Sequence, residues 1–264
     1  IGRSAGQGNL SSSTIAIGYR ALLGANSASG TIAIGIQAVE SNTTGAWILG
    51  IGYSALKSNT IGIANLAIGS YASELNVDGG YNLAIGAFAL QNSTGSENLG
   101  VGYESLKVNT TGTRNTAIGF RTLKNANGSH NVAVGYQSGD AITTGDFNVA
   151  IGSSALPNFT TGSNNVAIGY FSGGNNITNA NSIYIGYSAK GSADGNTNET
   201  VIGYAATGYG SNTTTLGNVS VTKTIIPSGN LGIGVTNPGQ KLEVSGSVYA
   251  IDYWSQSDKN AYYM

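Results

Sequence analysis

The residues best suited to acid–base, nucleophilic or metal chemistry are few in this chain of 264 residues. His130 is the single histidine and there is no cysteine, so a histidine-based triad or a zinc site lacks the partners that it needs. His130 lies in the stretch "NGSHN" (127–131), whose residue types are typical of a turn. We therefore interpret His130 as a turn residue.

The carboxylates are scattered, and none recurs at a fixed place along the chain. Asp140 and Asp146 flank the turn "AITTG" (141–145), and glycosidases use two carboxyl groups roughly 5–10 Å apart. Residues this close in sequence reach such a separation by accident, so we predict no catalytic pair. The glycine-rich "GIGVTNPG" (232–239) lacks the G-x-x-x-x-G-K-S/T pattern and the following helix of a phosphate-binding loop. The sequence predicts a protein that is not an enzyme and needs no cofactor or metal.

The composition points to a structural protein. Charged residues make up 9% of the chain, against roughly a quarter in ordinary globular domains, and there are 41 glycines. With 40% apolar residues the chain lacks the composition of a disordered protein. The net charge of −1 gives no reason to expect nucleic-acid or anionic-membrane binding. No apolar run is long enough to span a bilayer.

Many of the glycines belong to a repeated sequence motif. An aliphatic residue followed by glycine recurs twelve times, always 16 or 17 residues after the previous copy. The repeated glycines are Gly18, Gly35, Gly52, Gly69, Gly86, Gly102, Gly119, Gly135, Gly152, Gly169, Gly186 and Gly203. Such a period is the signature of a solenoid, in which each unit buries its apolar face against its neighbours.

The residues before each glycine alternate, as a β-strand requires. The position just before the glycine is predicted to form the structural core: Ile17, Ile34, Ile51, Ile68, Ile85, Val101, Ile118, Val134, Ile151, Ile168, Ile185 and Ile202. A second aliphatic column lies two residues earlier. Small residues between the two columns point to the opposite face, where close packing predicts a subunit seam: Ala16, Ala33, Ala67, Ala84, Ala117, Ala133, Ala150 and Ala167.

The residues after each glycine predict a second short strand and a turn. An aromatic residue follows the glycine in eight units, and small residues and a leucine come next, as in "YSAL" (53–56). Turns such as "NTTG" (42–45) close the unit, because Asn, Thr and Gly are turn formers. Several turns also match the Asn-x-Ser/Thr glycosylation signal, at Asn42, Asn109, Asn158 and Asn212, although turn chemistry alone generates that pattern.

An asparagine column precedes the strands. It comprises Asn65, Asn82, Asn98, Asn115, Asn131, Asn148 and Asn165. Asparagines stacked coil on coil can satisfy one another as an amide ladder. The predicted fold is an all-β parallel β-roll or β-solenoid over residues 1–217, about 55–60 Å long at one strand spacing per coil.

The motif N-x-A-I-G-Y/F-x-A/S-L resembles the head repeats of trimeric autotransporter adhesins. The 17-residue form with Asn-Thr-Thr-Gly turns is still more similar to repeats of phage tail-fibre proteins. The resemblance covers roughly residues 10–217 and is specific because the motif recurs twelve times. It implies parallel β-rolls, left-handed in the adhesin heads, set side by side as a homotrimer.

Residues 218–264 form a second predicted segment, an intertwined β stem for trimerisation. "IPSGNLGIGVTNPGQKLEVSGSVYA" (226–250) is similar to the segment that precedes an intramolecular chaperone in fibre proteins. In that family the chaperone is often released by Ser-Lys chemistry and opens at Ser-Asp, as Ser257-Asp258 would. The basic run expected there is missing, so we assign no protease. Aromatic residues near the end are predicted to fill an oligomer contact: Tyr253, Trp254, Tyr262 and Tyr263.

Among the aromatic residues after the glycines, five are candidates for contact with a receptor: Tyr19, Tyr53, Tyr103, Tyr136 and Tyr170. Exposed rings can stack on sugars. The favoured alternative is that they cover the edge of each coil or pack between subunits.

These observations favour a trimeric, tail-fibre-like structural protein that spaces and presents host-attachment surfaces. Its expected partners are a host glycan or other receptor and further tail or fibre proteins, in a virion or on an extracellular surface. A bacterial adhesin or surface-filament subunit is the alternative, and a polysaccharide-degrading tailspike is a third. An ice-binding solenoid would need a flat threonine array, whereas the threonines here gather in turns.

Overall fold

The computed structural model describes residues 1–8, 13–24, 29–174, 176–225 and 229–246. The chain divides into two compact units, Ile1–Ser220 and Val221–Met264. The described residues contain short β-strands and no helix. The strands of the first unit are β1 (Ile15–Ile17), β2 (Ile32–Ile34), β3 (Leu49–Ile51), β4 (Leu66–Ile68), β5 (Leu83–Ile85), β6 (Leu99–Val101), β7 (Thr116–Ile118), β8 (Val132–Val134), β9 (Val149–Ile151), β10 (Val166–Ile168), β11 (Ile183–Ile185), β12 (Thr200–Ile202) and β13 (Thr214–Leu216).

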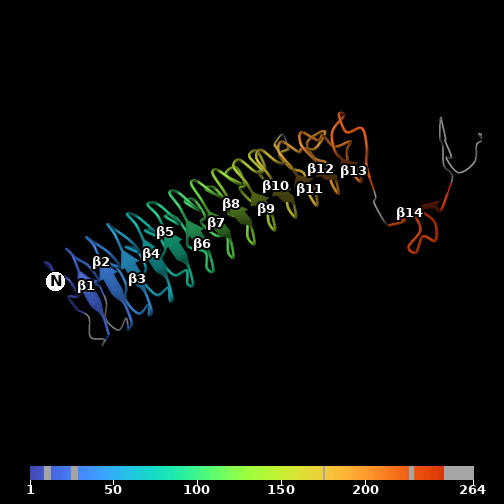
Figure 1. Cartoon of the computed structure of the whole chain (residues 1–264). Coiled ribbons are helices and arrows are strands. Elements are labelled where there is room, and N and C mark those ends of the chain that lie inside the picture. Colours follow the sequence, from blue (N-terminus) through green and yellow to red (C-terminus); the bar gives the residue numbers. More distant parts are fainter. Residues whose placement is uncertain (9–12, 25–28, 175, 226–228, 247–264) are drawn as a thin grey trace, which may run out of the picture. The chain divides into compact units, whose positions relative to one another are not determined.

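The first unit is a parallel β-solenoid, as predicted (Figure 1). Its thirteen strands form one sheet in chain order, and each strand pairs in parallel with the strand one coil away. The register places like residues side by side, so that Ala133 pairs with Ala150 and Val134 with Ile151. The repeat period therefore corresponds to one coil of the solenoid.

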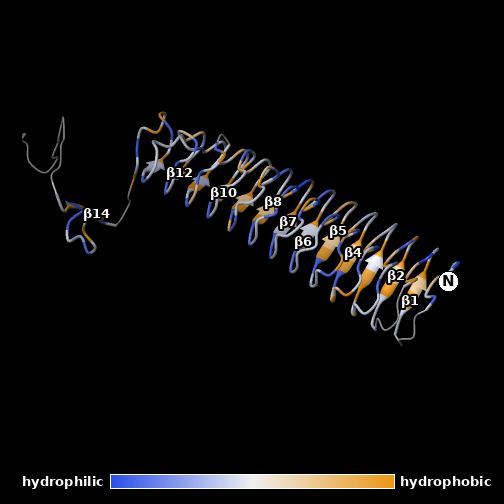
Figure 2. Cartoon of the chain, turned by 180° about the vertical axis from the view of Figure 1, so that it is seen from behind, coloured by the Kyte–Doolittle hydropathy of each residue, from blue (hydrophilic) through white to orange (hydrophobic). Residues whose placement is uncertain are grey.

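The two faces of this sheet are reversed from the prediction. The alanines point into the roll, and Ala33, Ala117 and Ala133 are 0% exposed. The aliphatic neighbours point outward, and Ile118 is 39% exposed. In Figure 2 many of the strand arrows carry the colour of apolar residues.

The prediction of a core is therefore wrong for the column before the glycine, whose members are partly or well exposed within the single chain: Ile17, Ile34, Ile51, Ile68, Ile85, Val101, Ile118, Val134, Ile151, Ile168, Ile185 and Ile202. The alanines cannot form a subunit seam, because they belong to or pack against the core of their own chain: Ala16, Ala33, Ala67, Ala84, Ala117, Ala133, Ala150 and Ala167.

The reason for the reversal is the narrow interior. Buried leucines from the segment after each glycine, such as Leu90 and Leu123, fill the roll. A Cβ at Gly100 would already lie 3.2 Å from Cγ of Leu90, so opposite these leucines the strand has room only for a small residue. Tyr184 takes the alanine position in β11, and Gly173 lies opposite it.

The segment after each glycine is not a second strand, which corrects that prediction. The second and fourth residues after the glycine have left-handed backbone conformations, as at Gln37 (φ 58°) and Val39 (φ 53°). The Gln37 N–H donates to the Tyr19 carbonyl of the preceding coil, and the Val39 N–H to the Ala55 carbonyl of the following coil, each at 2.8 Å. This segment is thus bonded to both neighbours without strand geometry.

The repeated glycine has two reasons to be glycine. Gly135 has a φ of 136°, which side-chain-bearing residues rarely adopt. A Cβ at Gly135 would also lie 2.6 Å from the carbonyl oxygen of Gly152 on the next coil. The column therefore permits close approach of successive coils.

The second unit contains the parallel strands β14 (Leu231–Ile233) and β15 (Leu242–Val244). Ser257-Asp258 and the aromatic residues Tyr253, Trp254, Tyr262 and Tyr263 lie outside the described residues.

Candidate binding surface

The asparagine column is buried at one inner corner of the solenoid. Oδ1 of Asn115 accepts the backbone N–H of Asn131 at 2.9 Å, and Nδ2 of Asn115 donates to the carbonyl of Gly128 at 2.8 Å. The same two kinds of bond recur along Asn65, Asn82, Asn98, Asn115, Asn131, Asn148 and Asn165. The amides bond mainly to the backbone of the next coil, with direct amide-to-amide bonds at a few places. This column holds the fold and is closed to ligands.

A second set of asparagines closes the turns. Oδ1 of Asn42 accepts the Gly45 N–H at 3.0 Å, and Nδ2 of Asn109 donates to the Gly112 carbonyl at 3.0 Å. Both side chains are fully buried. These two Asn-x-Ser/Thr sites are therefore used in turns and are inaccessible in the folded chain.

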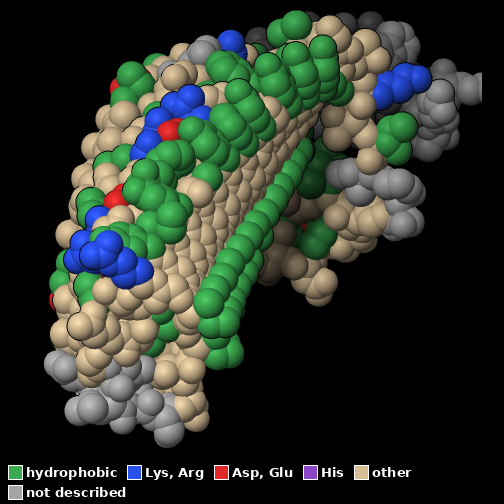
Figure 3. Space-filling model, turned by 90° about the vertical axis from the view of Figure 1, so that its left-hand side faces the viewer, with side chains coloured by type: hydrophobic (Ala, Val, Ile, Leu, Met, Phe, Trp, Pro, Cys, Tyr) green, Lys and Arg blue, Asp and Glu red, His purple; other side chains and the backbone are tan. Residues whose placement is uncertain are grey.

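Two columns of aliphatic side chains line the outer face of the sheet. They are the first and third residues of the strands, for example Val132 and Val134 of β8. All are aliphatic except Thr116, Thr200 and Thr214. We call these columns the aliphatic stripe. At one strand spacing per coil and two residues of width, it is about 60 Å long and 7 Å wide, or roughly 400 Å². Figure 3 shows hydrophobic side chains in bands along the rod. An apolar patch of this size is comparable to the largest patch on an ordinary monomer, and such patches are often functional.

The aromatic residues after the glycines form a ladder on the outside of the roll. Its ring centroids are 5.1–5.8 Å apart through Tyr53, Tyr71, Phe88, Tyr103, Phe120 and Tyr136. A second series joins Tyr170, Tyr187 and Tyr204. Tyr71 and Phe88 were missed by the prediction. They lie one residue later than the aromatic column, in the coils where Ser70 and Ala87 occupy it.

The five candidate aromatics are all exposed. Tyr53, Tyr103 and Tyr136 belong to the first series and Tyr170 to the second, and Tyr19 makes no ring contact within the described residues. The planes of Phe120 and Tyr136 are only 6° apart. Where neighbouring rings are stacked they cover one another's faces and leave mainly edges toward solvent, whereas Tyr53 and Tyr71, and likewise Phe88 and Tyr103, meet edge to face. This geometry suits a stabilising ladder or a subunit contact better than sugar stacking.

A charged cluster lies on two neighbouring coils. The Glu104 carboxylate contacts Nζ of Lys107 at 2.7 Å, Nζ of Lys124 at 3.2 Å and Nε of Arg121 at 3.5 Å. The hydrogen bond from Lys107 holds the pKa of Glu104 below its usual range. Burial raises the pKa of Asp140, although Arg121 and Lys124 oppose that shift. The cluster ties coils together through ion pairs.

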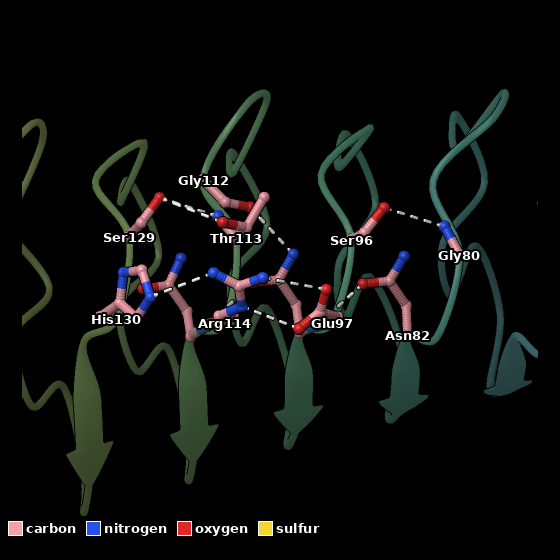
Figure 4. A network of polar contacts seen from close by, with 11 residues as sticks. Gly80, Asn82, Ser96, Glu97, Gly112, Thr113, Arg114, Ser129 and His130 are labelled. Carbon is pink, nitrogen blue, oxygen red and sulfur yellow. Dashed lines mark hydrogen bonds and ion pairs between the residues drawn. The ribbon is translucent and has the colours of Figure 1, made fainter.

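One residue of each coil, just before the buried corner position, has a left-handed backbone conformation. The corner position itself holds asparagine in seven coils and Thr31, Ile48, Ser182 or Glu199 in the others. We call the left-handed residues the outer-edge column: Gly30, Trp47, Ala64, Tyr81, Glu97, Arg114, His130, Phe147, Asn164, Asn181 and Asn198. Figure 4 shows Glu97, Arg114 and His130 in line on successive coils. Arg114 Nε lies 2.8 Å from Glu97 Oε2, and Arg114 Nη1 lies 3.4 Å from His130 Nε2. His130 stacks on Phe147 with ring centroids 4.7 Å apart.

Of the two aspartates that flank the turn at 141–145, Asp146 bonds to a neighbouring coil. Oδ1 of Asp146 accepts the Ser129 N–H at 2.6 Å, so Asp146 joins neighbouring coils. Among the described residues, no group of three or more His, Cys, Asp or Glu side chains could hold a metal ion. In the same part of the chain, no helix is long and apolar enough to cross a membrane.

Comparison with known proteins gives no relative. No family model matches the chain, and no curated protein or solved structure matches it significantly. The class of protein is therefore defined by the fold, a parallel β-solenoid of 16–17-residue coils.

Proposed function

We propose that this chain is the rod segment of a homotrimeric fibre that spaces and presents host-attachment surfaces. The observation that carries the proposal is the aliphatic stripe. Side chains such as Ile118 and Ile151 remain 39% exposed in the single chain, and they recur at the same place on every coil. An uncovered apolar line of this length favours a partner with the same repeat, and a second and third copy of the chain provide one.

The stripe replaces the alanine column as the proposed seam. Three parallel rods would bury it around a common axis, while the outer-edge column and the turns remain candidates for contact with a host. The likeness of the N-x-A-I-G motif to tail-fibre and adhesin repeats supports the same arrangement. Three identical chains also make weak individual contacts sufficient through avidity. The rod would act in a virion tail or on an extracellular surface, attached to other fibre proteins, and would perform no catalysis.

The test is the structure of the protein in its natural assembly by electron cryo-microscopy, without imposed symmetry. A three-fold bundle attached to a tail, with the aliphatic stripes facing the axis, is the expected result. A three-fold bundle on a bacterial surface would instead identify an adhesin. A solitary roll, or rolls joined end to end, would reject the trimeric fibre.

A further inference from the structure

The outer-edge column contains large side chains where the backbone disfavours them. Every residue in it has positive φ, for example Trp47 at 56° and Tyr81 at 60°. Glycine and asparagine tolerate this conformation best, and asparagine does occupy it at Asn164, Asn181 and Asn198. Other residues lose about 1–2 kcal/mol there.

Burial does not compensate for this strain. Trp47 is 69% exposed, Tyr81 61% and Phe147 54%, so these rings contribute little to the core. Their sizes also vary from coil to coil, unlike the aliphatic and asparagine columns. Exposed, strained aromatic residues on a regular scaffold are a reason to look for a ligand.

Trp47 is the largest ring of the column, and it is 69% exposed although its Cδ1 lies beside Gly30. Its neighbours in the column are Gly30 and Ala64, and within the described residues neither Trp47 nor Tyr81 contacts another aromatic ring. This differs from the aromatic ladder, where stacked neighbours cover the ring faces.

We propose that the outer-edge column from Gly30 to Phe147 binds a linear, uncharged glycan lying along the rod. The proposal deepens the proposed function, because it rests on attachment as the role of the outer surface and names the ligand class. Sugar rings present C–H faces that pack on an indole or phenol ring, and their hydroxyls both donate and accept hydrogen bonds.

The column supplies these groups in a line. Trp47 and Tyr81 are two coils apart, about 9.5 Å along the rod, with the small side chain of Ala64 between them. An extended chain of β-linked sugars can therefore place alternate units on the two rings. Further along, Glu97 offers acceptors and Arg114 offers donors to hydroxyls. Because these two side chains form an ion pair, the line has no excess charge, which favours a neutral glycan over a polyanion.

A second copy of the chain fits this column poorly. From Gly30 to Phe147 it extends about 34 Å and is one side chain wide, an area on the order of 300 Å². Its side chains also change from coil to coil, so it offers no regular repeat that a second copy of the chain could match. The narrow, irregular line thus suits an extended polymer, while the regular aliphatic stripe is left for the subunit seam.

The test uses the assembled full-length protein on a microarray of linear surface glycans, with neutral and anionic chains. Trp47→Asn and Tyr81→Asn remove the rings and install the residue that this backbone prefers, so the melting temperature should stay equal or rise. Tyr209→Asn is the control, because Tyr209 is an exposed tyrosine outside the column. We expect binding to at least one neutral linear glycan. Each column variant should weaken it about tenfold or more, and the control should not.

Fluorescence gives an independent measurement. The chain has two tryptophans, Trp47 and Trp254, so Trp254→Phe leaves Trp47 as the sole indole. Its fluorescence can then report titration with a hexasaccharide of whichever neutral glycan binds on the array. The inference would be overturned if the protein bound no neutral glycan or bound only anionic chains. It would also be overturned if Trp47→Asn and Tyr81→Asn left glycan binding unchanged. If the protein forms a trimer that attaches to cells without using the outer-edge column, the glycan inference is wrong and the fibre proposal stands. If the chain binds the glycan through the column but never assembles, the fibre proposal is wrong and the glycan inference stands.

Discussion

The side-chain oxygen of Asn115 accepts the backbone N–H of Asn131 on the next coil at 2.9 Å. The amide nitrogen of the same Asn115 side chain donates to the Gly128 carbonyl at 2.8 Å. One side chain therefore replaces two backbone hydrogen bonds at a corner where the chain leaves its turn. Because seven coils use asparagine in this way at the same place, the bonds explain why it recurs there with so little variation in spacing.

Replacing Asn115 with alanine should destabilise the coils on either side. The change leaves the buried Asn131 N–H and Gly128 carbonyl without these partners, and each lost partner costs about 1–3 kcal/mol. We expect a loss of roughly 2–4 kcal/mol, measured by hydrogen exchange as lower protection of the Asn131 amide. Asn92→Ala is the matched control, since the Asn92 side chain makes no hydrogen bond within the described residues. Equal effects of the two variants would contradict the role given to the column.

Gly135→Ala should be among the most damaging small substitutions. Alanine at φ 136° is strained by about 1–3 kcal/mol, and its Cβ would meet the Gly152 carbonyl oxygen at 2.6 Å. Gly210→Ala separates the two effects, because Gly210 also has a φ far from that of side-chain-bearing residues, at 111°, but no atom would lie within 4 Å of its Cβ. We expect the melting temperature to fall by roughly 5–10 °C for Gly135→Ala and by less than half of that for Gly210→Ala.

The period, strand positions and parallel stacking could be predicted from the sequence because they depend on local, repeated chemistry. Gly135 and its equivalents mark the coil, and the alternation around Ala133 marks the strand. The inward face could not be assigned from alternation alone, since alternation shows only that two faces differ. The decision comes from the interior volume. Leu123 and its equivalents from the opposite wall fill the roll, so the strand must contribute Ala133 rather than Val132 or Val134.

The outer-edge column was missed for a related reason. Its residues share a backbone conformation and not a residue type, so Trp47 and His130 do not form a visible sequence column. The available signal was Asn164, Asn181 and Asn198, which repeat just before the buried corner position and favour left-handed backbone. The second strand was predicted wrongly because small and large residues also alternate in the left-handed segment at Gln37 and Val39.

Stability should depend on pH in opposite directions through Glu104 and Asp140. The folded pKa of Glu104 is lowered, first by the Lys107 hydrogen bond, so its contribution is present at neutral pH and is lost as the pH falls below about 4. The folded pKa of Asp140 is raised by burial, so ionisation there lowers stability as the pH rises through that value.

Two variants separate these contributions in denaturant titrations between acid and neutral pH. Glu104→Gln should flatten the acid loss of stability. Asp140→Asn should stabilise the fold at neutral pH, and the gain should vanish in acid. If Asp140→Asn lowered stability at neutral pH, the raised pKa of Asp140 would be contradicted. If Glu104→Gln lost as much stability in acid as the natural chain does, the lowered pKa of Glu104 would be contradicted.

Ile118→Asp should separate folding from assembly. Ile118 points away from the core and is 39% exposed, so a carboxylate there can stay hydrated in a single chain and leave the roll folded. In the proposed trimer the same carboxylate would enter an apolar seam in three copies, at a cost of several kcal/mol. Sedimentation should therefore show a trimer for the natural chain and a monomer for the variant, with unchanged circular dichroism.

Thr111→Asp adds the same charge to an exposed turn of the same coil and should leave the trimer intact. A trimer that survives Ile118→Asp would place the seam elsewhere, and a variant that loses its β signal would show that the stripe contributes to the fold of each chain.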